Sequence, residues 1–125
     1  MILDSNIIID HLRLLARKRS FLDLIAEKIE PDDLAVSVIT IQELFTGKST
    51  QGLNEQDRIL AIIAPLKVLA YTYEIAQGAG EIMRDIQTDV EFADAAIAAT
   101  AIFHNAKLYT LNQKDFRVIK DLELY

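Results

Sequence analysis

The fold is indicated first by the N-terminal stretch MILDSNIIID, residues 1–10. A short apolar run, Met1 to Leu3, ends at Asp4, and a helix-like run begins at Ile7. The same alternation of short β-like runs and longer helical runs continues along the chain. Strands followed by helices form βαβ units, in which parallel strands are covered by helices on both faces. We therefore expect a single α/β domain spanning residues 1–125, with a mostly parallel sheet.

The apolar pattern predicts five strands and six helices. The expected strands are Met1 to Leu3, Leu34 to Val38, Lys67 to Tyr71, Lys107 to Leu111 and Leu122 to Leu124. The expected helices are Ile7 to Leu15, Ser20 to Ile29, Ile41 to Thr46, Asn54 to Ala64, Thr72 to Gln87 and Ala93 to His104. Pro31 and Pro65 each separate a helix from the next strand. In such a sheet, ligands bind beyond the carboxyl ends of the strands.

Composition narrows the class of protein. The chain is 51% apolar and 26% charged, which is typical of a globular protein, and it has no cysteine for a disulfide or a thiolate zinc site. Its uncharged apolar runs fall short of the about 18 residues that a membrane span needs. No basic segment precedes an apolar one at the N-terminus, so we expect no secretory signal and a cytoplasmic location. The net charge of −6 argues against nucleic-acid binding by bulk electrostatics. To bind a polyanion, an acidic protein of this kind would need bound cations, a confined basic stripe or a second subunit.

Four acidic residues are candidates for a shared site at the carboxyl edge of the sheet. Asp4 follows the first strand, Glu43 lies just past the second, and Asp115 follows the fourth. Asp94 begins an alanine-rich helix. Each residue also has a purely structural interpretation. Asp4 could cap a helix or form an Asx-turn, Glu43 could close a capping box with Thr40, Asp94 could be an N-cap, and Asp115 could be a turn residue.

The joint placement of the four acids favours a metal site. Carboxylates packed together repel one another and destabilise the fold unless a cation lies between them. Carboxylate oxygens are preferred ligands of Mg²⁺ and Mn²⁺. Such ions activate water and stabilise charge on a leaving oxygen, so phosphodiester hydrolysis is the expected chemistry.

Four segments together resemble those of PIN-domain proteins, specifically the toxins of VapBC-type toxin–antitoxin pairs. They are Leu3–Asp10, Ser37–Leu44, Asp94–Ala99 and Leu108–Phe116, and their order and spacing span essentially the whole chain. The resemblance implies a PIN-like α/β/α domain over residues 1–125 with strand order 3-2-1-4-5. It also implies Mg²⁺- or Mn²⁺-dependent endoribonuclease activity on an RNA substrate, a homodimer and a cognate antitoxin.

The resemblance also implies roles for individual residues. Asp4, Glu43 and Asp94 match the three most constant acids, and Asp115 is the expected fourth, with Asn112 as the alternative at that corner. Ser5, Asn6 and Thr40 are expected to orient carboxylates or water, as is Asn112. Asp10 is expected to point away. Glu91 would be a supporting acid or, with Thr88, part of a capping box.

Basic and apolar residues predict contacts with partners. Lys48, Lys114 and Arg117 flank the expected site and are candidates for RNA contact. Arg13, Arg17, Lys18 and Arg19 form a basic cluster that would contact RNA, a partner chain or only solvent. The helix with Ile7, Ile8, Ile9, Leu12, Leu14 and Leu15 has more apolar surface than one short helix needs inside, so we expect part of it to be covered by a second copy or an antitoxin segment.

Residues after the first and third expected strands disfavour two other functions. A receiver domain needs an Asp after its third strand, where this chain has Ala70-Tyr71-Thr72. A haloacid-dehalogenase-type phosphatase needs Asp-x-Asp after the first strand, where this chain has Asp4-Ser5-Asn6. The remaining alternatives are a PIN-like binding module without catalysis and an RNA-processing PIN nuclease outside a toxin–antitoxin pair.

Overall fold

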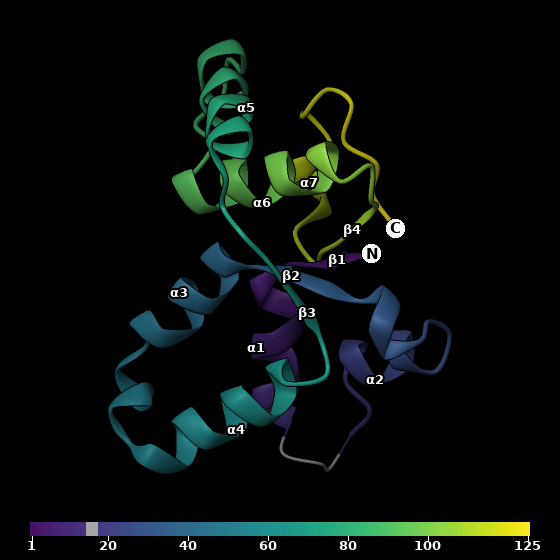
Figure 1. Cartoon of the computed structure of the whole chain (residues 1–125), viewed down its shortest axis with the longest axis vertical. Helices are drawn as coiled ribbons and strands as arrows, with labels where there is room; N and C mark the ends of the chain where they lie inside the picture. Colours follow the sequence, from purple (N-terminus) through teal and green to yellow (C-terminus); the bar gives the residue numbers. More distant parts are fainter. Residues whose placement is uncertain (15–17) are drawn as a thin grey trace.

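A four-stranded parallel sheet forms the centre of the computed structural model, which describes residues 1–14 and 18–125 (Figure 1). The strands are β1 (Ile2–Leu3), β2 (Ala35–Ser37), β3 (Lys67–Leu69) and β4 (Leu108–Tyr109), in the order β3-β2-β1-β4. The helices are α1 (Ser5–Leu14), α2 (Phe21–Ala26), α3 (Val38–Thr46), α4 (Leu53–Ile63), α5 (Tyr73–Asp85), α6 (Phe92–Phe103) and α7 (Gln113–Phe116). Two short 3₁₀ helices are η1 (Pro31–Asp33) and η2 (Lys48–Gln51).

The single α/β domain with a parallel sheet is confirmed, and two details of the prediction are wrong. The expected fifth strand, Leu122 to Leu124, is reduced to one parallel bridge between Leu124 and Leu108. The order 3-2-1-4 therefore matches the expected 3-2-1-4-5 except at this edge. Helix α7 was not predicted, because its four mostly polar residues carry no apolar period. The predicted end of the first helix, Leu15, and the basic residue Arg17 lie outside the described residues.

Alternation of side chains along the strands builds two cores, one on each face of the sheet. Ile2 packs with residues of α6 and α7, such as Ile97 and Phe116. The next residue, Leu3, packs on the opposite face with residues of α1 to α4, such as Ile8. Successive strand residues point to opposite faces, so this division follows from the pleat. Figure 1 shows the result, with α6 and α7 on one side of the sheet and α1 to α4 on the other.

Small residues let α5 and α6 pack closely as an outer pair. Ala79 of α5 is buried together with Ala95 and Ala99 of α6. A Cβ at Gly78 would lie 3.8 Å from the Ala99 Cβ, so α5 and α6 approach closely at this glycine. The alanine-rich α6 therefore contacts the sheet on one side and α5 on the other.

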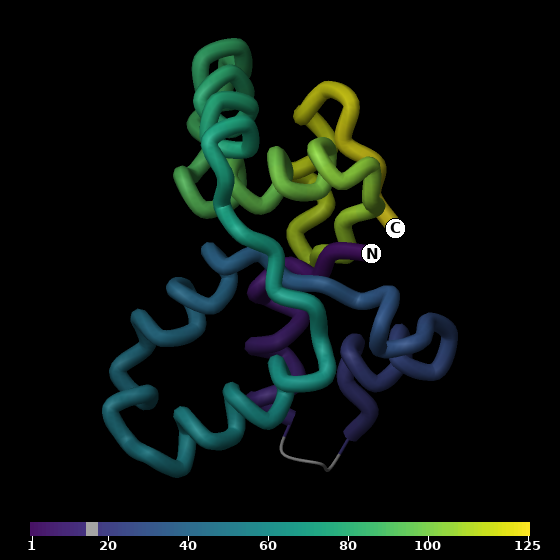
Figure 2. Tube along the Cα trace, in the orientation of Figure 1, coloured from purple at the N-terminus to yellow at the C-terminus, as the bar shows by residue number. Residues whose placement is uncertain are grey.

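Both ends of the chain lie at the β4 side of the sheet (Figure 2). Strand β1 pairs with β4 through the matches Ile2 to Leu108 and Leu3 to Tyr109. The Leu108 amide donates to the Glu123 carbonyl, and the Tyr125 amide donates to the Leu108 carbonyl. This register fixes which residues face each other where β1 and β4 end. In residues 1–14 and 18–125, no helix has both the length and the apolar character for a membrane span.

Candidate functional site

Asp4 directly follows β1 and is only 3% exposed, so its carboxylate depends on protein donors. Its Oδ1 atom accepts the Ser5 backbone N–H at 2.8 Å and lies 3.3 Å from the Ser5 hydroxyl. Its Oδ2 atom accepts from Asn6 Nδ2 at 2.8 Å and from the Thr110 hydroxyl at 2.6 Å. Burial raises the pKa of Asp4, and these hydrogen bonds oppose the rise.

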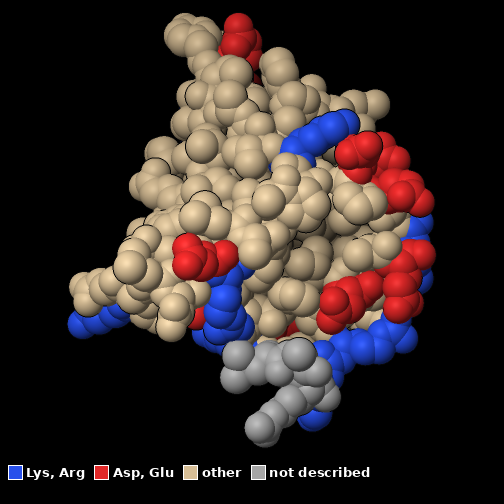
Figure 3. Space-filling view, turned by 60° about the horizontal axis from the view of Figure 1, so that its bottom comes forward, with Lys and Arg blue, Asp and Glu red and all other residues tan. Residues whose placement is uncertain are grey.

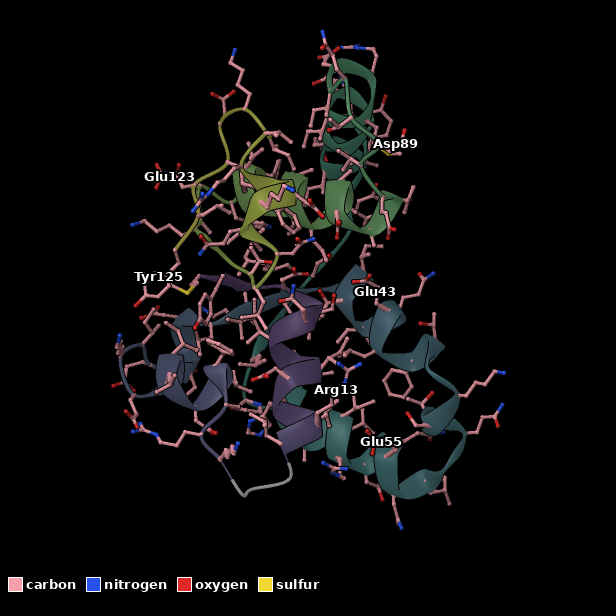
Figure 4. The ribbon with its side chains drawn as sticks, turned by 180° about the vertical axis from the view of Figure 1, so that it is seen from behind. Arg13, Glu43, Glu55, Asp89, Glu123 and Tyr125 are labelled. Carbon is pink, nitrogen blue, oxygen red and sulfur yellow. The ribbon has the colours of Figure 1, made fainter. Side chains whose placement is uncertain are left out.

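Ser5 joins Asp4 to Glu43, although the two acids are far apart in the sequence. The Ser5 hydroxyl donates to Glu43 Oε2 at 2.6 Å. Burial raises the pKa of Glu43, the Ser5 hydrogen bond lowers it, and the charges of Asp4 and Glu91 raise it further. Ser5 and Asn6 thus orient carboxylates in this structure, as the sequence led us to expect. Figure 4 shows Glu43 at the level of the sheet, and Arg13 and Glu55 line one hollow together with it.

Thr110 belongs to the same network, although it was not among the candidate residues predicted from the sequence. Its hydroxyl lies 2.6 Å from Asp4, and it accepts the Asn112 backbone N–H at 3.0 Å. Asn6 Nδ2 also lies 3.2 Å from this hydroxyl. Thr110 follows β4 as Asp4 follows β1, and the match of Leu3 with Tyr109 places the two next to each other. A polar residue at the end of an apolar strand was the signal that could have found it.

Among the candidate acids, Asp94 has the most clearly raised pKa. Its pKa is raised from 3.8 to about 6, first by burial and then by the charges of Asp4, Glu43, Glu91 and Asp115. Repulsion of this kind requires that the carboxylates lie near one another. Asp94 is the third residue of α6, whose N-cap is Glu91, so the N-cap interpretation of Asp94 is wrong.

Asp94 also lines a hollow of about 480 Å³ between the start of α6 and α7. Asp115, Asn112 and Lys114 of the α7 region line it too, together with Glu91. Asn112 Nδ2 donates to Asp115 Oδ2 at 2.7 Å, so these two candidates are in direct contact. Lys48 and Arg117 are not among the residues that line this hollow.

Two predicted capping boxes are absent, because the helices begin at other residues. Ser37 caps α3 by accepting the Ile39 N–H, so Thr40 lies inside the helix and Glu43 is free to reach Ser5. Thr40 is fully buried, and its hydroxyl has no partner in the described part of the chain. Glu91 makes no side-chain cap hydrogen bond at α6, and Thr88 lies outside the helix.

Asp10 and Arg19 make their side-chain contacts outside the network around Asp4. Asp10 Oδ2 accepts the Phe21 N–H at the start of α2, as expected for a residue that points away from the site. Arg19 forms an ion pair with Glu27, so part of the basic cluster is neutralised. Figure 3 shows acidic and basic side chains interspersed on this face. The described residues therefore form no continuous basic surface here.

The donor chemistry fits a hard divalent cation, although the carboxylates are held by protein donors. In residues 1–14 and 18–125, no three Asp, Glu or His side chains are grouped closely enough to hold a metal ion as they stand. Asp4 Oδ2 accepts from two donors, whereas Oδ1 accepts only the Ser5 backbone N–H, because the one proton of the Ser5 hydroxyl goes to Glu43. Oδ1 therefore keeps one lone-pair position that no protein donor uses among the described residues. Carboxylates with raised pKa values are the groups that a Mg²⁺ or Mn²⁺ ion would stabilise.

Comparison with known proteins assigns the family. The family model for the PIN domain matches residues 1–122. This chain belongs to the PIN-domain family. The PIN domain is 32% identical over 126 residues to ribonuclease VapC10 of Mycobacterium tuberculosis, covering 98% of this chain and 90% of that protein.

Solved structures agree with this PIN-domain fold. The chain is similar to VapBC-1 from nontypeable Haemophilus influenzae, with a TM-score of 0.76, 28% identity and coverage of 99% of this chain and 95% of that one. It is also similar to a toxin–antitoxin complex from Klebsiella pneumoniae, with a TM-score of 0.74, 26% identity and coverage of 97% and 93%. The predicted family resemblance is confirmed.

Proposed function

We propose that this PIN domain is a Mg²⁺- or Mn²⁺-dependent endoribonuclease and the toxin of a type II toxin–antitoxin pair. The observation that carries the proposal is the environment of Asp94, whose pKa is raised to about 6 first by burial and then by the charges of four neighbouring carboxylates. A fold gains nothing from such repulsion unless a ligand relieves it. The similarity to ribonuclease VapC10 supports RNA as the substrate class.

Asp4, Glu43 and Asp94 would hold the cation, with Asp115 as a further acid reached across the hollow. A divalent ion would supply activation of water and stabilisation of the leaving oxygen. The chain itself orients the ligands. Ser5, Asn6 and Thr110 hold both oxygens of Asp4, and Ser5 sets the position of Glu43.

Lys114 would bring positive charge to the substrate. It lines the hollow beside Asp94 and Asp115, and an acidic protein needs such a local cation to meet RNA phosphates. Lys48 and Arg117 would contact RNA farther along its backbone. We expect Lys114→Ala to weaken binding of a single-stranded RNA, measured by fluorescence anisotropy in the Asp94→Asn background. Lys28→Ala, on the α2 side, is the control. Equal affinity for both variants would remove Lys114 from the RNA-binding surface.

An antitoxin and a second copy of the chain would each cover part of the apolar surface of α1 that the fold leaves exposed. Ile7 and Ile8 are fully buried in the chain, so they supply none of the surface that the sequence led us to expect for a partner. Ile9 and Leu12 instead line a hollow of about 280 Å³ that also includes Glu43. An antitoxin segment there would bind beside the carboxylates and block them. Light scattering of the isolated chain and of the pair tests both associations, and a monomer at high concentration would argue against the homodimer.

Cleavage of labelled RNA tests the proposed activity. Wild type, Asp4→Asn and Asp94→Asn would be compared in Mg²⁺, Mn²⁺ and EDTA. Asp10→Asn is the matched control, because within the described residues the Asp10 side chain bonds only the Phe21 N–H, and the amide oxygen of asparagine can still accept it. We expect cleavage by wild type and by the control in either metal, and loss of cleavage in EDTA or with either site variant. Activity that persists in EDTA would refute the proposal.

A further inference from the structure

A third hollow, of about 570 Å³, lies between α5, α6 and residues 118–121. Figure 1 shows α5 and the loop after α7 on the same side of the sheet as α6. We call this hollow the α5–α6 groove. Val118 and Ile119 line both this groove and the hollow beside Asp94, so they separate the two. None of the four candidate acids, Asp4, Glu43, Asp94 and Asp115, lines the groove.

The groove has an apolar floor that the chain does not cover. Ile82, Ile86 and Ile102 line it and are only partly buried. Phe103 and Val118 also line it, and each is 53% exposed. Contiguous exposed apolar groups of this kind mark binding surfaces. Burial of two such large side chains would contribute substantially to the affinity for a partner.

The rim of the groove is acidic. Glu74, Glu81, Asp85 and Asp121 line it, and Lys120 is the one cation among the lining residues. Asp85 is neutralised by a two-pronged contact with Arg84, at 2.6 and 2.8 Å. The other three acids form no ion pair within the described residues. The groove therefore favours a cationic ligand and repels nucleic acid.

The spacing along α5 fits a helical ligand. The lining residues of α5 recur every three or four positions from Glu74 to Asp85, continuing to Ile86 just beyond the helix. They therefore form one face about 18 Å long, enough for about three turns of a bound helix. Gly78 lies in the middle of this face, where the absence of a side chain keeps the floor open.

We propose that the α5–α6 groove binds an amphipathic helix of a partner protein, with apolar side chains on the floor and flanking Lys or Arg residues on the acidic rim. Helix-in-groove recognition uses apolar anchors at this spacing. A second copy of the chain fits less well, because each copy carries a net charge of −6 and would bring acidic surface to an acidic rim. This inference does not depend on the proposed nuclease activity.

Binding of designed peptides tests the proposal. The probe is a fluorescein-labelled peptide of about 14 residues with leucine on one helical face and lysine elsewhere. The first control peptide has the same composition in scrambled order, and the second has glutamate in place of lysine. Anisotropy is measured on the full chain in about 0.15 M salt, where distant charges are screened. We expect the amphipathic cationic peptide to bind at least about tenfold more tightly than either control.

Paired variants locate the binding site. Phe103→Ser and Glu81→Lys, in the groove, should each weaken binding about tenfold. Phe92→Ser and Glu30→Lys are matched changes outside it and should leave binding unchanged. Val118→Ser repeats the apolar test at a side chain with the same exposure as Phe103, in case Phe103→Ser unfolds the chain. RNA cleavage measured on Phe103→Ser and Glu81→Lys, whose residues line the groove and not the hollow beside Asp94, reports separately on the proposed nuclease.

Three results would overturn the proposal. Equal binding of the scrambled peptide would show attraction to acidic surface in general. Equal weakening by groove and control variants would place the peptide elsewhere. Loss of a dimer in Phe103→Ser or Val118→Ser, measured by sedimentation, would show that a second copy occupies the groove.

Discussion

Replacement of Asp94 by asparagine should stabilise the metal-free protein at neutral pH. The change keeps the shape of the side chain and removes the charge that Asp4, Glu43, Glu91 and Asp115 oppose. A mutation at a proposed catalytic residue is thus expected to improve folding while it abolishes activity. Such an exchange between stability and function is common at active sites.

The size of the effect follows from the pKa of Asp94. Its value of about 6 in the folded protein lies above the ordinary 3.8, so the folded state binds the proton more tightly than the unfolded state. The contribution of Asp94 to stability is therefore greatest below about pH 4 and falls as the pH rises to about 6, with a full difference of about 3 kcal/mol. Because Asp94 is partly exposed to solvent, we expect about half of this, about 1.5 kcal/mol.

Urea unfolding at several pH values in EDTA measures this effect. At pH 7 the free energy of unfolding of Asp94→Asn should exceed that of wild type by about 1.5 kcal/mol, and near pH 4 the two should agree. Asp10→Asn should show no such gain. Millimolar Mn²⁺ should stabilise wild type and not the variant, because only an ion bound to the folded site shifts the equilibrium. Equal or lower stability of Asp94→Asn at pH 7 would refute the clustering of the acids.

Three further substitutions test the surroundings of the site. Thr110→Val removes the 2.6 Å hydrogen bond to buried Asp4 and should lower the free energy of unfolding in urea by about 1–3 kcal/mol. An unchanged free energy would show that Ser5 and Asn6 are enough to hold Asp4. Thr40→Val replaces a buried hydroxyl that has no partner among the described residues, and it should raise the free energy of unfolding in urea by about 1 kcal/mol. A lower free energy of unfolding would mean that the hydroxyl is hydrogen-bonded in solution. Gly80→Ala adds a Cβ that meets nothing within 4 Å inside α5 and should raise stability by about 0.5–1 kcal/mol, measured as a higher melting temperature; a fall would place a neighbour at this position.

The order of elements could be predicted from the sequence because apolar runs alternate with helical ones along the whole chain. The ends of the elements could not, since they depend on hydrogen bonds. Helix α3 begins at Val38 rather than Ile41 because Ser37 caps it. Only Leu124 of the expected fifth strand pairs with β4, so the apolar pattern there did not determine pairing.

The location of the site was also predictable, and its internal contacts were not. Residues that follow parallel strands share one edge, which is why Asp4 and the segment after β4 meet. The contact between Ser5 and Glu43 depends on where α3 begins. The contact between Thr110 and Asp4 depends on the register of β1 with β4. Neither can be read from residue spacing alone.

The central claim, that these carboxylates hold the cation that drives RNA cleavage, is tested most directly by single-turnover cleavage across a series of Mn²⁺ concentrations. In wild type the rate should rise from zero in EDTA and saturate, and Asp10→Asn should follow the same curve. Asp4→Asn should require a much higher Mn²⁺ concentration for its half-maximal rate or show no cleavage, because it loses a buried ligand charge. An identical Mn²⁺ dependence in Asp4→Asn and wild type, or cleavage without any divalent ion, would contradict the account.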